Sequence, residues 1–157
     1  MAGAHEMLLN TIPRPDCSAR PLRWEGDAII HAPVSAVFAA WTTRLDTWFA
    51  QPGTLSFDPE PGRPFFFYNR TDWGRHPHYG RVLACEQDRM IEMTWVTGDG
   101  TDLGTCGAET IVRITLEPRG DATAIYLAHE GFVSMASRNA HGENWPIALQ
   151  LLDEALA

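Results

Sequence analysis

The chain has 157 residues, which is the size of one domain with a core of its own. Its composition is 45% hydrophobic and includes six tryptophans, which excludes a disordered chain and predicts tryptophan side chains in a core, a cavity or an interface. The formal net charge of −8 repels nucleic-acid phosphates and anionic lipid headgroups, so neither nucleic acid nor a membrane is expected as a partner.

Residues 1–21 are predicted to form an N-terminal arm, and residues 22–157 the domain. Pro13, Pro15 and Pro21 favour extended backbone in the arm. Two states of the arm are compatible with this pattern, because it could be disordered or lie along the domain.

One strand and two short helices are predicted at the start of the domain. The strand is expected over residues 22–30. Ala32-Pro33 follows, and proline suits the first position of a helix, so a helix is expected from Val34 onward. Residues 45–49 predict a second short helix, which Pro52-Gly53 would end.

Strand-like segments occupy most of the remaining chain. They cover residues 54–58, 65–69, 79–86, 90–96, 110–116 and 122–130. Residues 71–77 are predicted to be a polar loop. Residues 98–107 are predicted to be a glycine-rich loop that could gate a cavity, and this loop lacks the lysine of a phosphate-binding loop.

A long helix is predicted at the C-terminus. Trp145, Leu149 and Leu152 recur at spacings of four and three, which places them on one helical face that can cover a sheet. Pro146 removes a backbone hydrogen bond, so a kink or a new helix start is expected there, with Asn144 as its cap. Tandem strands with helices at both ends indicate one α+β domain.

Short motifs along the chain resemble one known family. They are Ala32-Pro33-Val34, Trp48-Phe49, Gly80-Arg81-Val82, Met93-Thr94-Trp95, residues 112–118, His129-Glu130-Gly131-Phe132 and Asn144-Trp145. Residues 22–157 resemble the bacterial homologues of the C-terminal domain of the activator of the ninety-kilodalton heat-shock chaperone ATPase, in the START-like, or SRPBCC, superfamily. Pro61-Gly62 stands where that family commonly has two glycines, so the local turn is expected to differ.

The resemblance implies a helix-grip fold. Such a fold is a curved antiparallel sheet of about six or seven strands around a long C-terminal helix, with an apolar cavity between the two. Because these motifs are packing motifs, they specify the fold rather than the chemistry.

Side-chain alternation along the strands predicts which residues would line that cavity. The predicted ligand-binding residues are Trp48, Phe49, Phe65, Phe67, Asn69, Ile91, Met93, Trp95, Ile125, Leu127, His129, Arg138, Trp145 and Leu149. His129, Asn69 and Arg138 would orient a ligand. The alternative is that the apolar side chains fill one another's space as a dry core, that His129 has a structural partner and that Arg138 lies on the surface.

No pattern in the sequence predicts a metal, a cofactor or a catalytic group. His76 and His78 flank Pro77 beside a Trp73-Gly74-Arg75 loop and have no third ligand nearby, so no metal site is expected. The chain has no Gly-x-Ser-x-Gly elbow. No two carboxylates are singled out as an acid–base pair.

A cytoplasmic location is expected from the cysteines and the N-terminus. The three cysteines are Cys17, Cys85 and Cys106, and an odd number without a Cys-x-x-Cys pair is typical of reduced thiols. Residues 1–7 lack the basic and apolar regions of a secretory signal. No apolar run approaches the roughly 20 residues that span a bilayer.

Three functions are compatible with these features. The sequence favours binding of a small hydrophobic or aromatic molecule over catalysis. An enzyme of the cyclase, aromatase or hydrolase type would instead need two titratable groups converging in the cavity with shifted pKa values. A chaperone-binding or self-associating module, including a homodimer, would need an exposed patch containing Trp24, Trp41 or Trp73.

Overall fold

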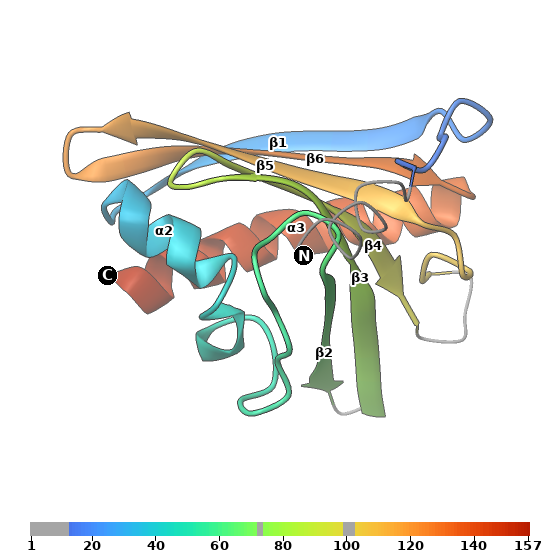
Figure 1. Cartoon of the computed structure of the whole chain (residues 1–157), viewed down its shortest axis with the longest axis horizontal. Helices are drawn as coiled ribbons and strands as arrows, with labels where there is room; N and C mark the ends of the chain where they lie inside the picture. The colour runs from blue at the N-terminus through green and yellow to red at the C-terminus, as the bar shows by residue number, and fades with distance from the viewer. Residues whose placement is uncertain (1–12, 72–73, 99–102) are drawn as a thin grey trace, which may run out of the picture.

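A curved sheet that wraps around one long helix is the main feature of the fold (Figure 1). The structure is a computed structural model that describes residues 13–71, 74–98 and 103–157. Its elements are β1 (Leu22–Ile30), α2 (Val34–Ala40), the 3-10 helix η1 (Leu45–Thr47), β2 (Pro64–Thr71), β3 (Gly74–Glu86), β4 (Met90–Thr97), β5 (Thr110–Arg119), β6 (Ala122–Phe132) and α3 (Met135–Leu156). The predicted α+β helix-grip arrangement is confirmed.

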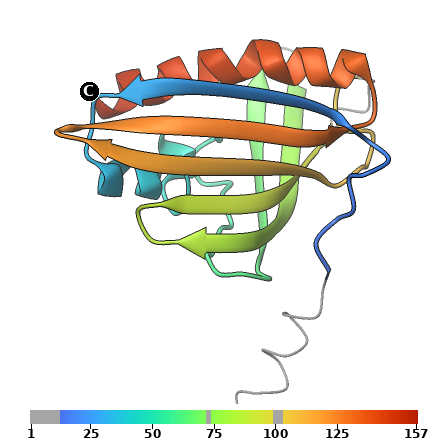
Figure 2. The same ribbon diagram turned by 90° about the horizontal axis from the view of Figure 1, so that it is seen from above.

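The six strands of this sheet are antiparallel and follow the order β1-β6-β5-β4-β3-β2. Each strand from β2 to β6 pairs with its neighbour in sequence, whereas β1 crosses to the far edge and pairs with β6. Figure 2 shows β1, β6 and β5 side by side, with α3 running along the sheet beside β1. In Figure 1, β2 and β3 turn steeply away from these strands, so the sheet is strongly curved.

The sharp turn of β3 coincides with an irregularity in its pairing with β4. The register between the two strands shifts between Val82 and Ala84, and a bulge of this kind bends a strand. Two residues earlier, the backbone of Gly80 lies so close to Thr94 that any Cβ at this position would collide with the Thr94 carbonyl oxygen. Glycine therefore allows β3 and β4 to approach at the bend.

Helix α3 lies against the concave side of the sheet along one face. Ser134 caps it by accepting a hydrogen bond from the Ser137 amide at 3.1 Å. The buried residues of the helix are Ser137, His141, Trp145, Ala148, Leu149 and Leu152. They recur at spacings of three and four, as the amphipathic pattern predicts. Among the described residues, no helix is long and apolar enough to cross a membrane.

Pro146 lies inside α3, and the predicted new helix start at this position is wrong. The helix is continuous from Met135 to Leu156, so Asn144 is an interior residue and not a cap. Proline removes one backbone hydrogen bond and its ring crowds the carbonyl group of Gly142, while the turns on both sides keep their own hydrogen bonds. The packing of α3 against the sheet can therefore hold a single helix through this position.

Helix α2 and η1 close one end of the space under the sheet. Trp41 and Leu45 are fully buried there, and they belong to one continuous core. The core also contains residues predicted from strand alternation, namely Phe65, Phe67, Ile91, Met93, Ile125 and Leu127. Burial of these side chains is the main stabilising contribution to the fold.

Two predicted segments differ from the structure. Residues 54–58 form no strand, because the only bridge in this stretch pairs Ser56 with Phe66 before the turn at Asp58 to Gly62 leads the chain away. Residues 74–77 of the predicted loop belong to β3, which begins at Gly74, while residues 72–73 of that loop lie outside the described residues. Pro77 is tolerated in β3 because of where its nitrogen lies. The nitrogen faces toward β4, but at a level past Thr97, where β4 has already ended.

The described part of the N-terminal arm, residues 13–21, lies along the domain. The Arg20 side chain donates to the carbonyl oxygens of Gly131 at 2.8 Å and Glu109 at 2.9 Å. Arg14 forms an ion pair with Glu92, whose carboxylate is almost entirely buried. These contacts tie this stretch to β4 and β6.

Candidate functional site

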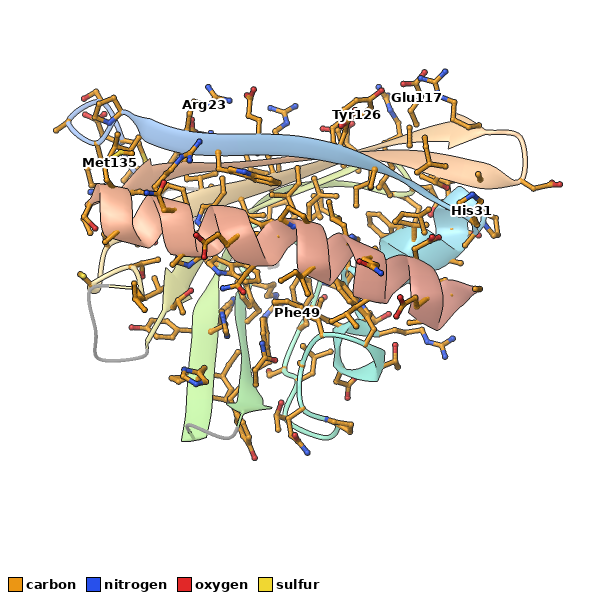
Figure 3. The ribbon with its side chains drawn as sticks, turned by 180° about the vertical axis from the view of Figure 1, so that it is seen from behind. Arg23, His31, Phe49, Glu117, Tyr126 and Met135 are labelled. Atoms are coloured by element: carbon orange, nitrogen blue, oxygen red, sulfur yellow. The ribbon has the colours of Figure 1, made fainter. Side chains whose placement is uncertain are left out.

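A cavity of about 530 Å³ lies between α3 and the end of the sheet formed by β2, β3 and β4. The residues that line it are Trp48, Phe49, Asn69, His76, His78, Trp95, Thr97, Leu103, Ala140, His141, Asn144, Trp145, Ile147, Ala148 and Leu151. Figure 3 shows Phe49 beside α3, on the side of the helix toward β2 and β3. None of these lining residues is Asp, Glu, Lys or Arg, so the described wall carries no permanent charge.

Aromatic rings form one wall of the cavity. The rings of Phe49 and Trp145 are stacked, with centroids 6.2 Å apart and planes at 12°. Trp95 packs at a tilt against both, at 6.1 Å from Phe49 and 5.4 Å from Trp145. Trp48 joins the group at 5.2 Å from Phe49, and its indole nitrogen donates to the Ala40 carbonyl. This wall is rigid and apolar, which suits contact with a flat apolar molecule.

Strand β3 contributes two histidines to the cavity wall, and the His78 ring packs against Phe49 at 6.0 Å and Trp95 at 5.3 Å. His76 pairs across the sheet with Asn69, and His78 pairs with Phe67. The His78 ring stacks on Phe67, with centroids 4.9 Å apart and planes at 8°. His78 Nδ1 lies 3.1 Å from the His76 carbonyl oxygen, which can only accept, so Nδ1 carries a proton. Because alternate residues share a face, both histidines point to the same side of β3.

His141 of α3 completes the polar part of the cavity. Its Nδ1 donates to the Ser137 carbonyl oxygen at 2.7 Å, because that oxygen can only accept. In the neutral ring, Nε2 is then an acceptor, and the Thr97 hydroxyl lies 3.1 Å from it and can donate. The helix and the end of β4 are therefore linked through a hydrogen bond at the cavity wall.

His129 lies beneath the cavity and is fully buried. The Trp145 indole N–H donates to His129 Nδ1 at 3.0 Å, so the proton of the neutral ring is on Nε2. Nε2 donates to the Thr110 hydroxyl at 2.7 Å, and that hydroxyl donates in turn to the Trp95 carbonyl. Both ring nitrogens thus have structural partners, and one of these belongs to the adjoining helix.

The environment of His129 keeps its ring uncharged. Burial is the largest cause that lowers the pKa of His129 well below the usual value of 6.5, followed by the neighbouring His141 and His78. A neutral ring with both nitrogens occupied neither offers nor takes a proton without breaking a hydrogen bond. We therefore assign His129 a positioning role, because it holds Trp95 and Trp145 in place under the cavity.

Two atoms of the cavity residues lack hydrogen-bond partners among the described residues. They are the indole nitrogen of Trp95 and the side-chain oxygen of Asn69, and both atoms are buried. The indole nitrogen of Trp41 is in the same state, but Trp41 does not line the cavity. Buried polar groups are almost always paired in folded proteins, so each of these atoms calls for an explanation.

The predicted ligand-binding residues fall into three groups in the structure. Five line the cavity: Trp48, Phe49, Asn69, Trp95 and Trp145. Eight are buried in the core or beneath the cavity: Phe65, Phe67, Ile91, Met93, Ile125, Leu127, His129 and Leu149. The remaining one, Arg138, donates to the Arg23 carbonyl oxygen at 3.0 Å, which ties α3 to β1 away from the cavity.

The sequence analysis did not identify most of the polar cavity residues. His76 was assigned to a loop and His78 was left outside the predicted strand that began at residue 79, although their alternation with one residue between them is the pattern of a strand face. Thr97 was two residues beyond Trp95 on the same strand face. His141 was four residues before Trp145, so the helical repeat already placed it on the buried face.

No group of three or more metal-ligating side chains is present in the part of the chain that the structure describes. The predicted glycine-rich loop lies partly outside the described residues at 99–102, and its Leu103 lines the cavity. Of the tryptophans considered for an interaction patch, Trp41 is fully buried and Trp24 is half-buried, while Trp73 lies outside the described residues.

A curved antiparallel sheet that grips a long C-terminal helix places the chain in the helix-grip class of folds. Within this class, the chain belongs to the family described as "Activator of Hsp90 ATPase homolog 1-like protein", which matches over residues 31–157. The predicted family is therefore confirmed. No curated protein matches the chain.

Solved structures share the fold at low sequence identity. The AHSA1 protein from Silicibacter pomeroyi is 22% identical with a TM-score of 0.70, and the match covers 85% of this chain and 96% of that one. A protein from Chromobacterium violaceum is 20% identical with a TM-score of 0.70, over 87% of this chain and 98% of that one. CalU16 from Micromonospora echinospora is 23% identical with a TM-score of 0.64, over 86% and 76% respectively.

Proposed function

We propose that this domain binds a small, flat, largely apolar molecule in the cavity between α3 and the β2–β4 end of the sheet. The observation that carries the proposal is a cavity of about 530 Å³ lined by packed aromatic rings and a few polar groups. Small-molecule sites commonly have volumes of roughly 300–1,000 Å³ and this mixture of lining groups.

Burial of apolar ligand surface would supply most of the binding free energy, at about 25 cal/mol for each Å² removed from water. The aromatic wall loses little conformational entropy on binding, because Phe49, Trp95 and Trp145 already pack against one another. The exposed side chains of Leu103, Ile147 and Leu151 line the same cavity and would extend the apolar contact at its rim.

The test is titration with N-phenyl-1-naphthylamine, an uncharged aromatic probe whose fluorescence rises in apolar surroundings. Ala140 lines the cavity from α3, so Ala140→Phe should fill part of the space and weaken probe binding at least tenfold. Ala136→Phe on an exposed position of the same helix is the matched control and should bind the probe normally. Equal binding by the two variants, or no binding by the unmodified protein, would contradict the proposal.

Acid–base catalysis in the same cavity is the second candidate, and the histidines are the observation that favours it. His76, His78 and His141 all line the cavity, and histidine is the commonest general acid or base near neutral pH. Hydrolysis of 4-nitrophenyl acetate would test this activity, with His78→Gln and His141→Gln as variants. Turnover that survives both substitutions would contradict a role for these histidines.

A further inference from the structure

The chemical nature of the ligand can be inferred from the atoms that lack partners, an inference that rests on the proposed binding function. Trp95 is 1% exposed, and it forms part of the cavity wall. Its indole N–H has no acceptor among the described residues. A buried donor left unpaired costs about 1–3 kcal/mol, and a ligand acceptor would remove that cost.

Asn69 presents the complementary group. Its side-chain oxygen is buried, is without a donor in the described part of the chain, and belongs to a residue that lines the same cavity. Asn69 lines the cavity from β2 beside its cross-strand partner His76 of β3, which lines the same cavity. A ligand that donates a hydrogen bond to this oxygen would satisfy the second unpaired atom.

The charges around the cavity restrict the ligand further. No carboxylate, lysine or arginine is among the described lining residues. His129 beneath the floor is held neutral, and each of its nitrogens already has a protein partner. An ionised ligand group would lose its hydration without gaining a permanent counter-ion, and such burial is costly.

We propose that the cavity selects an uncharged aromatic molecule bearing a hydroxyl group, with an oxygen that accepts from the Trp95 indole N–H and a hydroxyl that donates to the Asn69 side-chain oxygen. Phenols and hydroxylated polycyclic aromatics have this chemistry. The aromatic wall binds the ring system, and the two unpaired atoms orient it.

The test uses four naphthalene probes that differ only in their substituent, with affinities measured by calorimetry. Naphthalene has no polar group, 2-methoxynaphthalene has an acceptor only, 2-naphthol has an acceptor and a donor, and 2-naphthoate is an anion. The expected order of affinity is 2-naphthol, then 2-methoxynaphthalene, then naphthalene. Each step is expected to be about tenfold, which is the factor of about 1.4 kcal/mol for one satisfied buried group. 2-Naphthoate should bind at least tenfold more weakly than 2-naphthol.

Two variants assign each step to its residue. Trp95→Phe removes the indole N–H and should abolish the preference for 2-methoxynaphthalene over naphthalene. Asn69→Leu removes the oxygen and should abolish the preference for 2-naphthol over 2-methoxynaphthalene. Trp41→Phe is the matched control, because it removes an equally unpaired indole N–H from a residue that does not line the cavity, and both preferences should survive.

The outcomes separate this inference from the proposed function. If all four probes bind equally, or if the preferences survive Trp95→Phe and Asn69→Leu, the inferred ligand chemistry is wrong while the cavity remains a binding site. Tighter binding of 2-naphthoate than of 2-naphthol would overturn the uncharged class. If no probe binds, both the inference and the proposed function are wrong.

Discussion

The two sides of α3 meet the rest of the domain differently. One side packs directly on β1, β6 and α2, and the side chains there fill the space between the elements. The other side faces β2, β3 and β4 across the cavity (Figure 3). The same helix and the same sheet therefore produce a solid core on one side and a hollow on the other.

The difference follows from the bend in β3. Beyond Gly80 and the bulge at Val82, the strand turns away from the plane of β1, β5 and β6 and takes β2 with it. Helix α2 and η1 fill the corresponding gap at the packed side, where Trp41 and Leu45 are fully buried. At the bend, rings from Trp48, Phe49 and Trp145 cover only part of the space. The cavity in this domain therefore lies where β2 and β3 turn away from α3.

The largest expected effect comes from two adjacent residues on different faces of α3. Leu152 is fully buried in the core, and Leu151 is 47% exposed at the cavity. Leu152→Ala should lower the free energy of unfolding by about 2–5 kcal/mol, because it leaves a void among packed side chains. Leu151→Ala should change it by less than about 0.5 kcal/mol and should weaken probe binding instead. Urea unfolding measures both, and equal losses would show that the two sides are packed alike.

The second effect tests His129, which lies where the packed and hollow regions meet. The pKa of His129 is lowered in the folded protein, first by burial, so below about pH 6.5 the unfolded chain binds a proton that the folded one does not. The stability that the folded protein keeps by holding His129 neutral is present in full above pH 6.5. It is lost as the pH falls toward the folded pKa of His129. The expected loss in the free energy of unfolding from this one group is up to about 1.4 kcal/mol for each pH unit.

The non-titrating variant His129→Gln provides the control for this pH dependence. Glutamine can donate to Thr110 but carries no titrating ring. Its unfolding free energy should depend less steeply on pH between 6.5 and 5 than that of the unmodified protein, by about one bound proton. Identical slopes would mean that His129 takes up a proton in the folded state, contrary to its assigned role.

The packed side was predictable from the sequence, and the cavity was predictable only in part. Strand alternation correctly grouped Ile125, Leu127 and His129 on the buried face, because period-two burial is a local property. Whether a buried side chain packs against another or lines a hollow depends on the bend of β3. That bend arises from the approach of Gly80 to Thr94, which are distant in sequence and adjacent only in the folded sheet.

His76 and His78 illustrate the same limit. Pro77 between them suggested a loop, since proline is uncommon inside a sheet. Proline fits here because Pro77 lies beside Gly98, the residue after the end of β4, and the hydrogen bond between them uses the Gly98 amide and the Pro77 carbonyl oxygen. The length of a neighbouring strand is tertiary information, and it decided the placement of two cavity residues.

The third effect extends the comparison to the outer face of the sheet, where ion pairs replace aromatic packing. Glu92 is 5% exposed and pairs with Arg14 of the arm, while Arg113 lies 3.8 Å away. Arg14→Gln should lower the free energy of unfolding by about 1 kcal/mol, because a buried carboxylate loses one partner but keeps Arg113.

A second ion pair on exposed surface is the control for Arg14. Arg23 pairs with Glu25, and both side chains are more than half exposed. Arg23→Gln should change stability by less than about 0.5 kcal/mol, since water and salt screen such a pair. If thermal unfolding shows the same loss for both variants, the arm does not hold the buried carboxylate of Glu92.

The smallest expected effect lies at the packed end, where α3 meets the chain after β1. Asp153 accepts a hydrogen bond from the His31 amide at 2.7 Å, and this bond is the main cause that lowers the pKa of Asp153 below its usual 3.8. The folded pKa is the lower one, so the stabilisation is present above about pH 4 and is lost as pH falls further.

Asp153→Asn should cost a few tenths to about 1 kcal/mol at pH 7, because the amide oxygen can still accept from His31 but the charge is gone. Near pH 2 the two proteins should approach equal stability in urea, whereas Glu154→Gln on the exposed side of the same turn should match the unmodified protein at both pH values. A difference between Asp153→Asn and the unmodified protein that persists unchanged at low pH would mean that this contact stabilises the packed end through shape rather than charge.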